Sequence, residues 1–418
     1  MRLGILLFIL LVVAACKQPH PAPDAEKPML ATGAWRMVLD LDSTSAELAL
    51  PFEFDLQRSR DRWHITIHNR DEAIPVDSIA VRGDSIRFRM PFFDSEFRGT
   101  IHDSTYFQGR WYNFLKGPDY SIPFTARFGE GPRFTKSAAP PSVDISGDWE
   151  VHFLDDDGNE PAIGIFAVDG ARVRGSFATE TGDLRFLDGT ATTDSLFLST
   201  FNGFQAYLFR AALRNDSLIG EFRSGHRWKQ SWYGVRNPSF TLANDETLTT
   251  LDPRHPVAFS LPDTQGRIHA LTDEVYQGKA VVVEIMGTWC PNCLDQSRLM
   301  GELYAKYQKD GLEAVALSFE RYADPKQALA AIERFRERLG IPYEILYGGM
   351  AQRDSVARQL PFISQLKGYP TTLLIARDGT VRHIYTGIYG PGTGARYLRF
   401  KERLENAIVE LLREPSAG

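Results

Sequence analysis

The sequence predicts a multidomain protein in which two N-terminal all-β modules, each an antiparallel sandwich or barrel, precede a C-terminal α/β domain. The chain has 418 residues, which is too long for one hydrophobic core and suits two or three domains. From about residue 35 to residue 237, short runs of β-forming residues alternate with Gly, Asp and Asn turns. After residue 251, apolar strands alternate with helical patterns, which is typical of a sheet with parallel pairs.

The composition is that of a packed protein. Hydrophobic residues make up 43% of the chain and charged residues 24%, so disorder over the bulk of it is not expected. The formal net charge is −6, and the sequence has no block of Lys and Arg. Proteins that bind nucleic acid need such a basic surface, so we expect no nucleic-acid partner.

Residues 1–15 have the pattern of an export signal. Arg2 precedes an apolar run that is shorter than the roughly 20 residues a membrane-spanning helix needs. The run ends in Val13-Ala14-Ala15-Cys16, which resembles the lipobox of bacterial lipoproteins. The resemblance implies lipidation of Cys16 and a lipid-anchored protein of the cell envelope that faces the periplasm. Lys17 after the Cys favours the outer membrane. The alternative is a plain signal peptide with an incidental Cys.

Residues 16–31 contain several prolines and predict an extended tether. Two β modules are expected to follow, at residues 32–136 and 143–240. Three short motifs recur between them with nearly equal offsets, which suggests an internal duplication; chance recurrence in a turn-rich chain remains the alternative. The paired motifs are Gly33-Ala34-Trp35 with Gly147-Asp148-Trp149, Asp84-Ser85-Ile86 with Asp194-Ser195-Leu196, and Asp103-Ser104 with Asp216-Ser217.

The α/β domain is expected at residues 251–415. A helix should begin at Asp324-Pro325, a cap followed by proline at the first helical position, and end at Gly340. The other helices expected are 294–308 and 395–412, and the strands expected are 281–286, 313–318, 343–346, 371–376 and 381–385.

Two cysteines lie where an apolar strand gives way to a helix, in Trp289-Cys290-Pro291-Asn292-Cys293. A disulfide across two intervening residues closes too short a loop to stabilise a fold, which favours a working dithiol. The helix N-terminus stabilises the thiolate form of Cys290, which can then attack a substrate disulfide. Cys293, one turn further on, is placed to resolve the mixed disulfide. We therefore expect the pair to cycle between dithiol and disulfide.

Half of a zinc site is the competing interpretation of this spacing. The only closely spaced histidines, His64 and His68, fall in a predicted strand, where four residues span about 13 Å, too far to share a metal ion. No metal and no dissociable cofactor are expected. An inert structural pair of cysteines is the other alternative.

From about residue 254 to 415 the sequence resembles the TlpA-like branch of the thioredoxin superfamily, which includes the ResA-type reductases. Besides the dithiol, the resemblance rests on residues 259–263 with Gly266, 278–283, 368–375 and Asp378-Gly379. It implies a thioredoxin-like domain in which the bond before Pro370 is cis and Pro370 packs beside the dithiol. Tyr369 would offer backbone groups to a substrate. The candidate substrate-binding residues are Trp289, Tyr369 and Pro370.

Glu284 interrupts an otherwise apolar strand six residues before Cys290. Burial should raise the pKa of its carboxyl. Thioredoxins resemble one another in carrying a buried acid at this place, which implies that Glu284 is the general base for Cys293. The alternative is a structural carboxylate paired with Lys or Arg.

These observations predict an envelope thiol-disulfide oxidoreductase that reduces protein disulfides. Its partners would be disulfide-bearing envelope proteins and an upstream dithiol electron donor, although Pro291-Asn292 does not fix the redox direction. A thiol peroxidase is one alternative, but Gly287-Thr288-Trp289-Cys290 departs from the peroxiredoxin pattern. A lipoprotein that binds a ligand or partner through its β modules, with a redox-sensing domain, is another.

Overall fold

The computed structural model describes residues 29–415, except 43, 46, 47, 61, 130, 132, 135–140, 142, 143, 156, 157 and 215. The predicted export signal, the lipidation site Cys16 and most of the predicted tether lie outside the described residues. No helix within the described ranges is long and apolar enough to cross a membrane.

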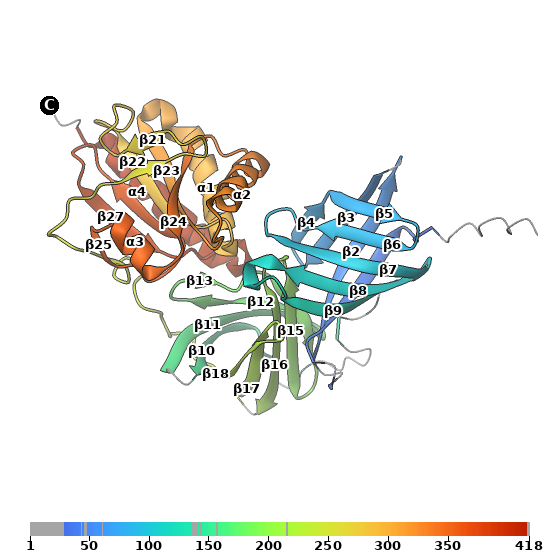
Figure 1. Cartoon of the computed structure of the whole chain (residues 1–418). Coiled ribbons are helices and arrows are strands. Elements are labelled where there is room, and N and C mark those ends of the chain that lie inside the picture. Colours follow the sequence, from blue (N-terminus) through green and yellow to red (C-terminus); the bar gives the residue numbers. More distant parts are fainter. Residues whose placement is uncertain are drawn as a thin grey trace, which may run out of the picture.

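Module 1 is an antiparallel sheet that curls into a barrel-like shape, blue to teal in Figure 1. Its nine described strands have the order β4-β3-β2-β1-β9-β8-β7-β6-β5. Inward-facing apolar side chains such as Leu39, Phe52 and Phe97 have no exposed surface and form its core. The strands are β1 (Gly33–Asp40), β2 (Ala49–Ser59), β3 (Arg62–Asn69), β4 (Glu72–Val76), β5 (Ser78–Arg82), β6 (Ser85–Arg89), β7 (Ser95–Asp103), β8 (Tyr106–Asn113) and β9 (Ser121–Phe128).

Module 2, green in Figure 1, is a closed barrel. Its described strands have the order β11-β10-β18-β17-β16-β15-β14-β12-β13, and β11 also pairs with β12, which closes the ring. Of the two predicted shapes, sandwich and barrel, this module has the second. The strands are β10 (Gly147–Asp155), β11 (Gly158–Asp169), β12 (Arg172–Thr179), β13 (Gly182–Asp183), β14 (Leu187–Ala191), β15 (Ser195–Phe201), β16 (Ala206–Arg214), β17 (Ser217–Ser224) and β18 (Trp228–Val235).

The two modules share local details that support the predicted duplication. Gly33 and Gly147 begin β1 and β10 with positive φ angles of 127° and 96°, which favour glycine. The indole N–H groups of Trp35 and Trp149 each donate to the carbonyl four residues earlier, both at 2.9 Å. Ser85 begins β6, and its predicted counterpart begins β15. Equivalent strands therefore stand nine places apart along the chain.

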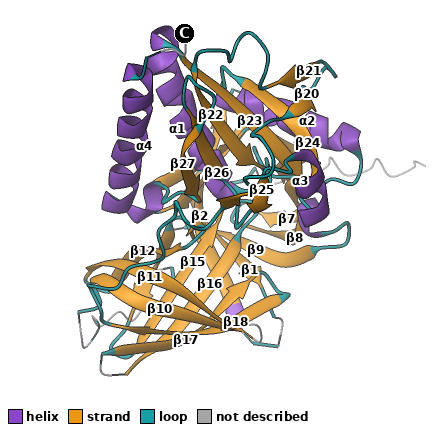
Figure 2. Ribbon diagram, turned by 90° about the vertical axis from the view of Figure 1, so that its left-hand side faces the viewer, coloured by secondary structure: helices purple, strands orange, loops and turns teal. Residues whose placement is uncertain are grey.

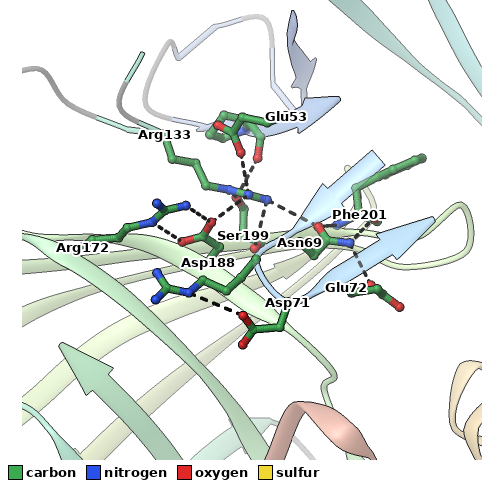
Figure 3. A network of polar contacts seen from close by, with 11 residues as sticks. Glu53, Asn69, Asp71, Glu72, Arg133, Arg172, Asp188, Ser199 and Phe201 are labelled. Atoms are coloured by element: carbon green, nitrogen blue, oxygen red, sulfur yellow. Dashed lines mark hydrogen bonds and ion pairs between the residues drawn. The ribbon is translucent and has the colours of Figure 1, made fainter. Parts of the chain in front are cut away.

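A buried arginine joins the two modules, as Figure 3 shows. Arg133, which lies between the last strand of module 1 (β9) and the first of module 2 (β10), donates to Glu53 of β2 at 2.7 Å and to the hydroxyl of Ser199 of β15 at 2.9 Å. Beside it, the side chain of Asn69 forms hydrogen bonds with both the carbonyl and the N–H of Phe201, at 2.7 and 3.1 Å. These hydrogen bonds, made largely by buried side chains, connect the two modules directly.

The C-terminal domain is built on a five-stranded sheet with the order β24-β23-β22-β26-β27. Strands β22, β23 and β24 are parallel, whereas β26 and β27 are antiparallel to their neighbours. Helices α1, α2 and α4 pack on one face and α3 on the other (Figure 2). The elements are β22 (Ala280–Met286), α1 (Pro291–Tyr307), β23 (Leu312–Glu320), α2 (Pro325–Leu339), β24 (Glu344–Met350), α3 (Arg353–Gln359), β26 (Thr371–Ile375), β27 (Val381–Thr386) and α4 (Ala395–Arg413).

Local sequence signals explain the longer elements. All seven residues of β22 are buried, as expected for an apolar strand covered on both faces. The side chain of Asp324 caps α2 by accepting from the N–H of Lys326 at 2.9 Å, and Gly340 ends the helix with a φ of 61°. The sequence patterns did not predict α3 or the pairing of β19 (Thr250–Leu251) with β25 (Ile363–Gln365). Both are too short to show a clear period.

Candidate active site

The dithiol lies at the start of α1. Cys290 is the N-cap residue, and its sulfur accepts a hydrogen bond from the N–H of Cys293 at 3.3 Å. Both cysteines are free thiols in this structure. Cys290 retains 7% of its surface exposed, whereas Cys293 has none. Cys290 is therefore the thiol that a substrate can reach first, and Cys293 lies behind it.

The residues predicted to bind substrate surround Cys290. The Tyr369–Pro370 peptide bond is cis, as the resemblance implied. The thiol of Cys290 donates to the carbonyl of Tyr369 at 3.6 Å. The rings of Trp289 and Tyr369 meet edge to face with their centres 5.5 Å apart. The indole N–H of Trp289 donates to the backbone carbonyl of Phe319 at 2.9 Å. The fold thus brings together all three predicted substrate-binding residues near the sulfur of Cys290.

Glu284 is 1% exposed and lies beneath the dithiol on β22. Its carboxylate accepts from the hydroxyls of Ser297, at 3.1 and 3.2 Å, and Tyr343, at 3.4 Å. These hydrogen bonds come from neutral groups, not from the Lys or Arg of the alternative interpretation. Burial raises the pKa of Glu284 to about 8. Burial, the hydrogen bond to Cys290 and the charges of Cys290 and Glu284 together raise the pKa of Cys293 well above its ordinary value.

The shifted carboxyl predicts how stability depends on pH. Because folding raises the pKa of Glu284 from 4.5 to about 8, the folded state holds a proton in this range that the unfolded state has lost. The contribution of Glu284 to stability therefore falls as pH rises through this window. Glu284→Gln keeps the shape of the side chain and removes its titrating carboxyl. The difference in thermal midpoint, variant minus wild type, should therefore rise between about pH 5 and pH 8. A constant difference across that range would contradict the burial of a titrating carboxyl.

A second buried acid, Glu320, was missed by the sequence analysis. It ends β23 without exposed surface and accepts from the N–H and hydroxyl of Thr288, at 2.9 and 2.8 Å. The hydroxyl of Ser318 donates to it at 2.6 Å. Glu320 therefore holds the turn that carries Trp289 and Cys290. An acid at the end of an apolar strand was the available signal, a weaker one than the acid inside an apolar strand that identified Glu284.

An arginine of module 2 reaches the dithiol helix. Arg185 follows β13, is 2% exposed, and donates to the carbonyl of Pro291, inside the Cys-x-x-Cys segment, at 3.0 Å. Its guanidinium also forms ion pairs with Asp295 of α1 and Glu72 of module 1. One buried cation thus connects both β modules to the helix that carries the dithiol.

Aromatic residues complete this junction. Phe204 of module 2 lies with its ring centre 5.7 Å from Phe93 of module 1 and 6.3 Å from Trp289. The hydroxyl of Ser95 donates to the carbonyl of Gly203 at 2.6 Å, which connects the start of β7 to the turn after β15. Phe93 belongs to the same buried cluster as Cys290 and Cys293. The β modules therefore form part of the walls around the dithiol, which sequence spacing did not reveal.

Two features of this site are typical of a thioredoxin-like domain. A free dithiol lies at the start of the helix that follows the buried strand β22, and a cis-proline lies opposite it, just before the neighbouring strand β26. Residues 254–384 match the AhpC/TSA family. The thiol-disulfide oxidoreductase ResA of Geobacillus thermodenitrificans (strain NG80-2) is 37% identical over 129 residues, which are 31% of this chain and 66% of the relative. ResA of Geobacillus kaustophilus (strain HTA426) is 35% identical, with the same coverage.

The chain thus spans just under two thirds of the length of these relatives, and the matches leave the β modules outside. A solved thiol:disulfide interchange protein of the thioredoxin family from Chlorobium tepidum TLS is 19% identical, with 39% of this chain and 97% of that chain covered and a TM-score of 0.30. Over these residues the C-terminal domain is similar to the AhpC/TSA family and to the ResA thiol-disulfide oxidoreductases. The predicted resemblance is confirmed.

Proposed function

We propose that the whole protein is an envelope thiol-disulfide oxidoreductase that reduces protein disulfides through Cys290 and Cys293. The observation that carries the proposal is the position of Cys290, at the N-terminus of α1 and 3.6 Å from the carbonyl of Tyr369, which precedes the cis-proline. A substrate segment laid along this peptide would bring its disulfide to the sulfur of Cys290.

The reaction proceeds in two exchanges. The thiolate of Cys290 attacks one substrate sulfur, forms a mixed disulfide and releases the other substrate sulfur as a thiolate. In molecules whose Glu284 is ionised, a fraction that grows as pH rises toward about 8, Cys293 passes its proton to that carboxylate. The sulfur of Cys293 then attacks the sulfur of Cys290, which releases the substrate and leaves a Cys290–Cys293 disulfide. The substrate gains two electrons, and a second dithiol protein must return two electrons to the enzyme.

Glu284→Gln should slow the second exchange, because Gln cannot accept the proton of Cys293. Loss of a general base lowers the rate of a step by about 10² to 10⁴-fold. Formation of the mixed disulfide by Cys290 should keep its rate. Rapid-quench separation of the two steps would measure this, and equal resolution rates in the variant and wild type from pH 6 to pH 8 would exclude Glu284 as the base.

The reduction potential of the dithiol tests the direction of electron flow. A potential near about −270 mV supports a reductant, whereas one near about −120 mV indicates an oxidant of folding proteins. Steady-state turnover with a protein disulfide and dithiothreitol tests the activity itself. Consumption of hydrogen peroxide without disulfide reduction would instead favour a thiol peroxidase.

We further propose that a lipid on Cys16 holds the protein in the envelope, with the catalytic domain facing the periplasm and the outer membrane as the favoured site. The support is the lipobox-like Val13-Ala14-Ala15-Cys16 after a short apolar run. In a bacterial host, wild type should incorporate labelled fatty acid and sediment with membranes, whereas Cys16→Ser should do neither. Equal labelling of both proteins would rule out this attachment.

A further inference from the structure

Resting on the proposed function, we propose that Lys116 and Arg321 form a binding site for carboxylate groups that flank the scissile disulfide of the substrate. The preferred substrates would then be acidic disulfides. The site lies beside Cys290, and all three domains contribute to it, since Lys116 belongs to module 1, Phe204 to module 2 and Arg321 to the C-terminal domain.

The two cations meet on one aromatic ring. The ammonium of Lys116 and the guanidinium of Arg321 each lie 5.6 Å from the ring centre of Phe204. Arg321 also lies 3.7 Å from the ring centre of Trp289, next to Cys290 in the chain. Contacts of this kind hold a cation without neutralising its charge. Arg321 is exposed, so a substrate can reach it.

Within the described part of the chain, neither cation has an ion pair with a carboxylate. The charges that act on Arg321 are those of Cys290, Tyr207 and Tyr369, and the charge that acts on Lys116 is that of Arg321. Burial first and the charge of Arg321 second lower the pKa of Lys116 to about 8. Lys116 and Arg321 are thus two cations held close together against aromatic rings without a carboxylate partner. A bound anion would stabilise their charged forms.

Nearby groups add to the positive potential. The guanidinium of Arg227 lies 5.0 Å from the ring centre of Tyr120, and Lys116 lies 5.4 Å from the same ring. The charges of Arg227 and Lys116 contribute to lowering the pKa of His226, after burial. This accumulation of cations stands out in a chain with a net charge of −6. Clustered cations raise the local concentration of an oppositely charged substrate.

The test compares the full chain on two peptide disulfides of equal length, one with Glu and the other with Gln on both sides of each Cys. At low ionic strength, kcat/KM for reduction of the Glu peptide should exceed that of the Gln peptide by about tenfold, the low end of electrostatic steering. In the double variant Lys116→Gln/Arg321→Gln, the ratio of kcat/KM for the Glu peptide to that for the Gln peptide should fall to about two or less. Added salt should lower the same ratio in the wild-type protein. Glutathione disulfide against its methyl ester gives the same comparison for a small substrate.

Two controls separate charge from packing and from net charge. Lys116→Arg/Arg321→Lys keeps both charges and should keep most of the ratio. Arg82→Gln/Lys309→Gln removes two exposed cations, from β5 and from the turn after α1, and should leave the ratio as in wild type.

The outcomes distinguish this site from the proposed function. Reduction of both peptides with equal kcat/KM, or a ratio unchanged in the double Gln variant, would overturn the carboxylate site and leave the reductase standing. Reduction of neither peptide would overturn both. Two kcat/KM ratios are compared here: glutathione disulfide over its methyl ester, and the Glu peptide over the Gln peptide. If the first ratio is larger, the site serves small acidic disulfides; if the second is larger, it serves acidic protein segments.

Discussion

Replacing Arg185 by alanine is expected to lower the free energy of unfolding by about 3 kcal/mol, the lower end of the range for breaking a buried ion pair. The variant leaves the buried Asp295 and the partly buried Glu72 without their shared cation. We expect the lower end because Asp295 keeps an ion pair with Arg298 at 3.7 Å. Urea-induced unfolding followed by tryptophan fluorescence would measure the loss.

The chain offers a matched control for this variant. Arg174 of β12 pairs with Asp71 across the same boundary between the modules at 3.8 Å, but both side chains are exposed. Arg174→Ala should therefore cost less than about 1 kcal/mol. Adding Glu72→Gln and Asp295→Asn to Arg185→Ala should restore part of the stability, because unpaired charges are removed. Equal effects of the two alanine variants would mean that Arg185 does not anchor the junction.

Replacing Cys290 by serine is expected to reduce disulfide reduction by at least about 10³-fold, the scale seen when a catalytic nucleophile is removed. Serine is close in size to cysteine, but its hydroxyl does not ionise to an attacking thiolate near neutral pH. The thermal midpoint should stay close to that of wild type, which separates loss of chemistry from loss of fold. Steady-state reduction of a protein disulfide would measure the effect, and substantial turnover by Cys290→Ser would place the activity elsewhere.

The sequence predicted the parts of the site that are local in the chain. The change of an apolar strand into a helical pattern placed the dithiol at a helix start, although α1 begins at Pro291 and not at the expected residue 294. The burial of Glu284 follows from its place in that strand. Pro370 could be placed only through the family resemblance, because an X-Pro bond is cis in about 5–6% of cases and its neighbours give no further signal. Local pattern and resemblance together were enough to predict that Cys290, Cys293, Glu284 and Pro370 belong to one candidate site.

The walls around the centre could not be predicted in this way. Arg185 and Pro291 are 106 residues apart in the chain, and the contact exists only because module 2 packs against α1. Phe204 lies in a turn between two strands, and no periodic signal marks it as a neighbour of Trp289. Domain packing is set by shape and charge complementarity over distant segments, which a single sequence does not show.

The most direct test of the central claim is to trap the mixed disulfide. The full chain carrying Cys293→Ser should react with a peptide disulfide to give a covalent adduct, with the peptide attached to Cys290 by mass spectrometry. Cys290→Ser should give no adduct under the same conditions, and dithiothreitol should release the peptide from the first variant. An adduct on Cys293 in the Cys290→Ser protein, or none on Cys290, would contradict the assignment of Cys290 as the attacking thiol.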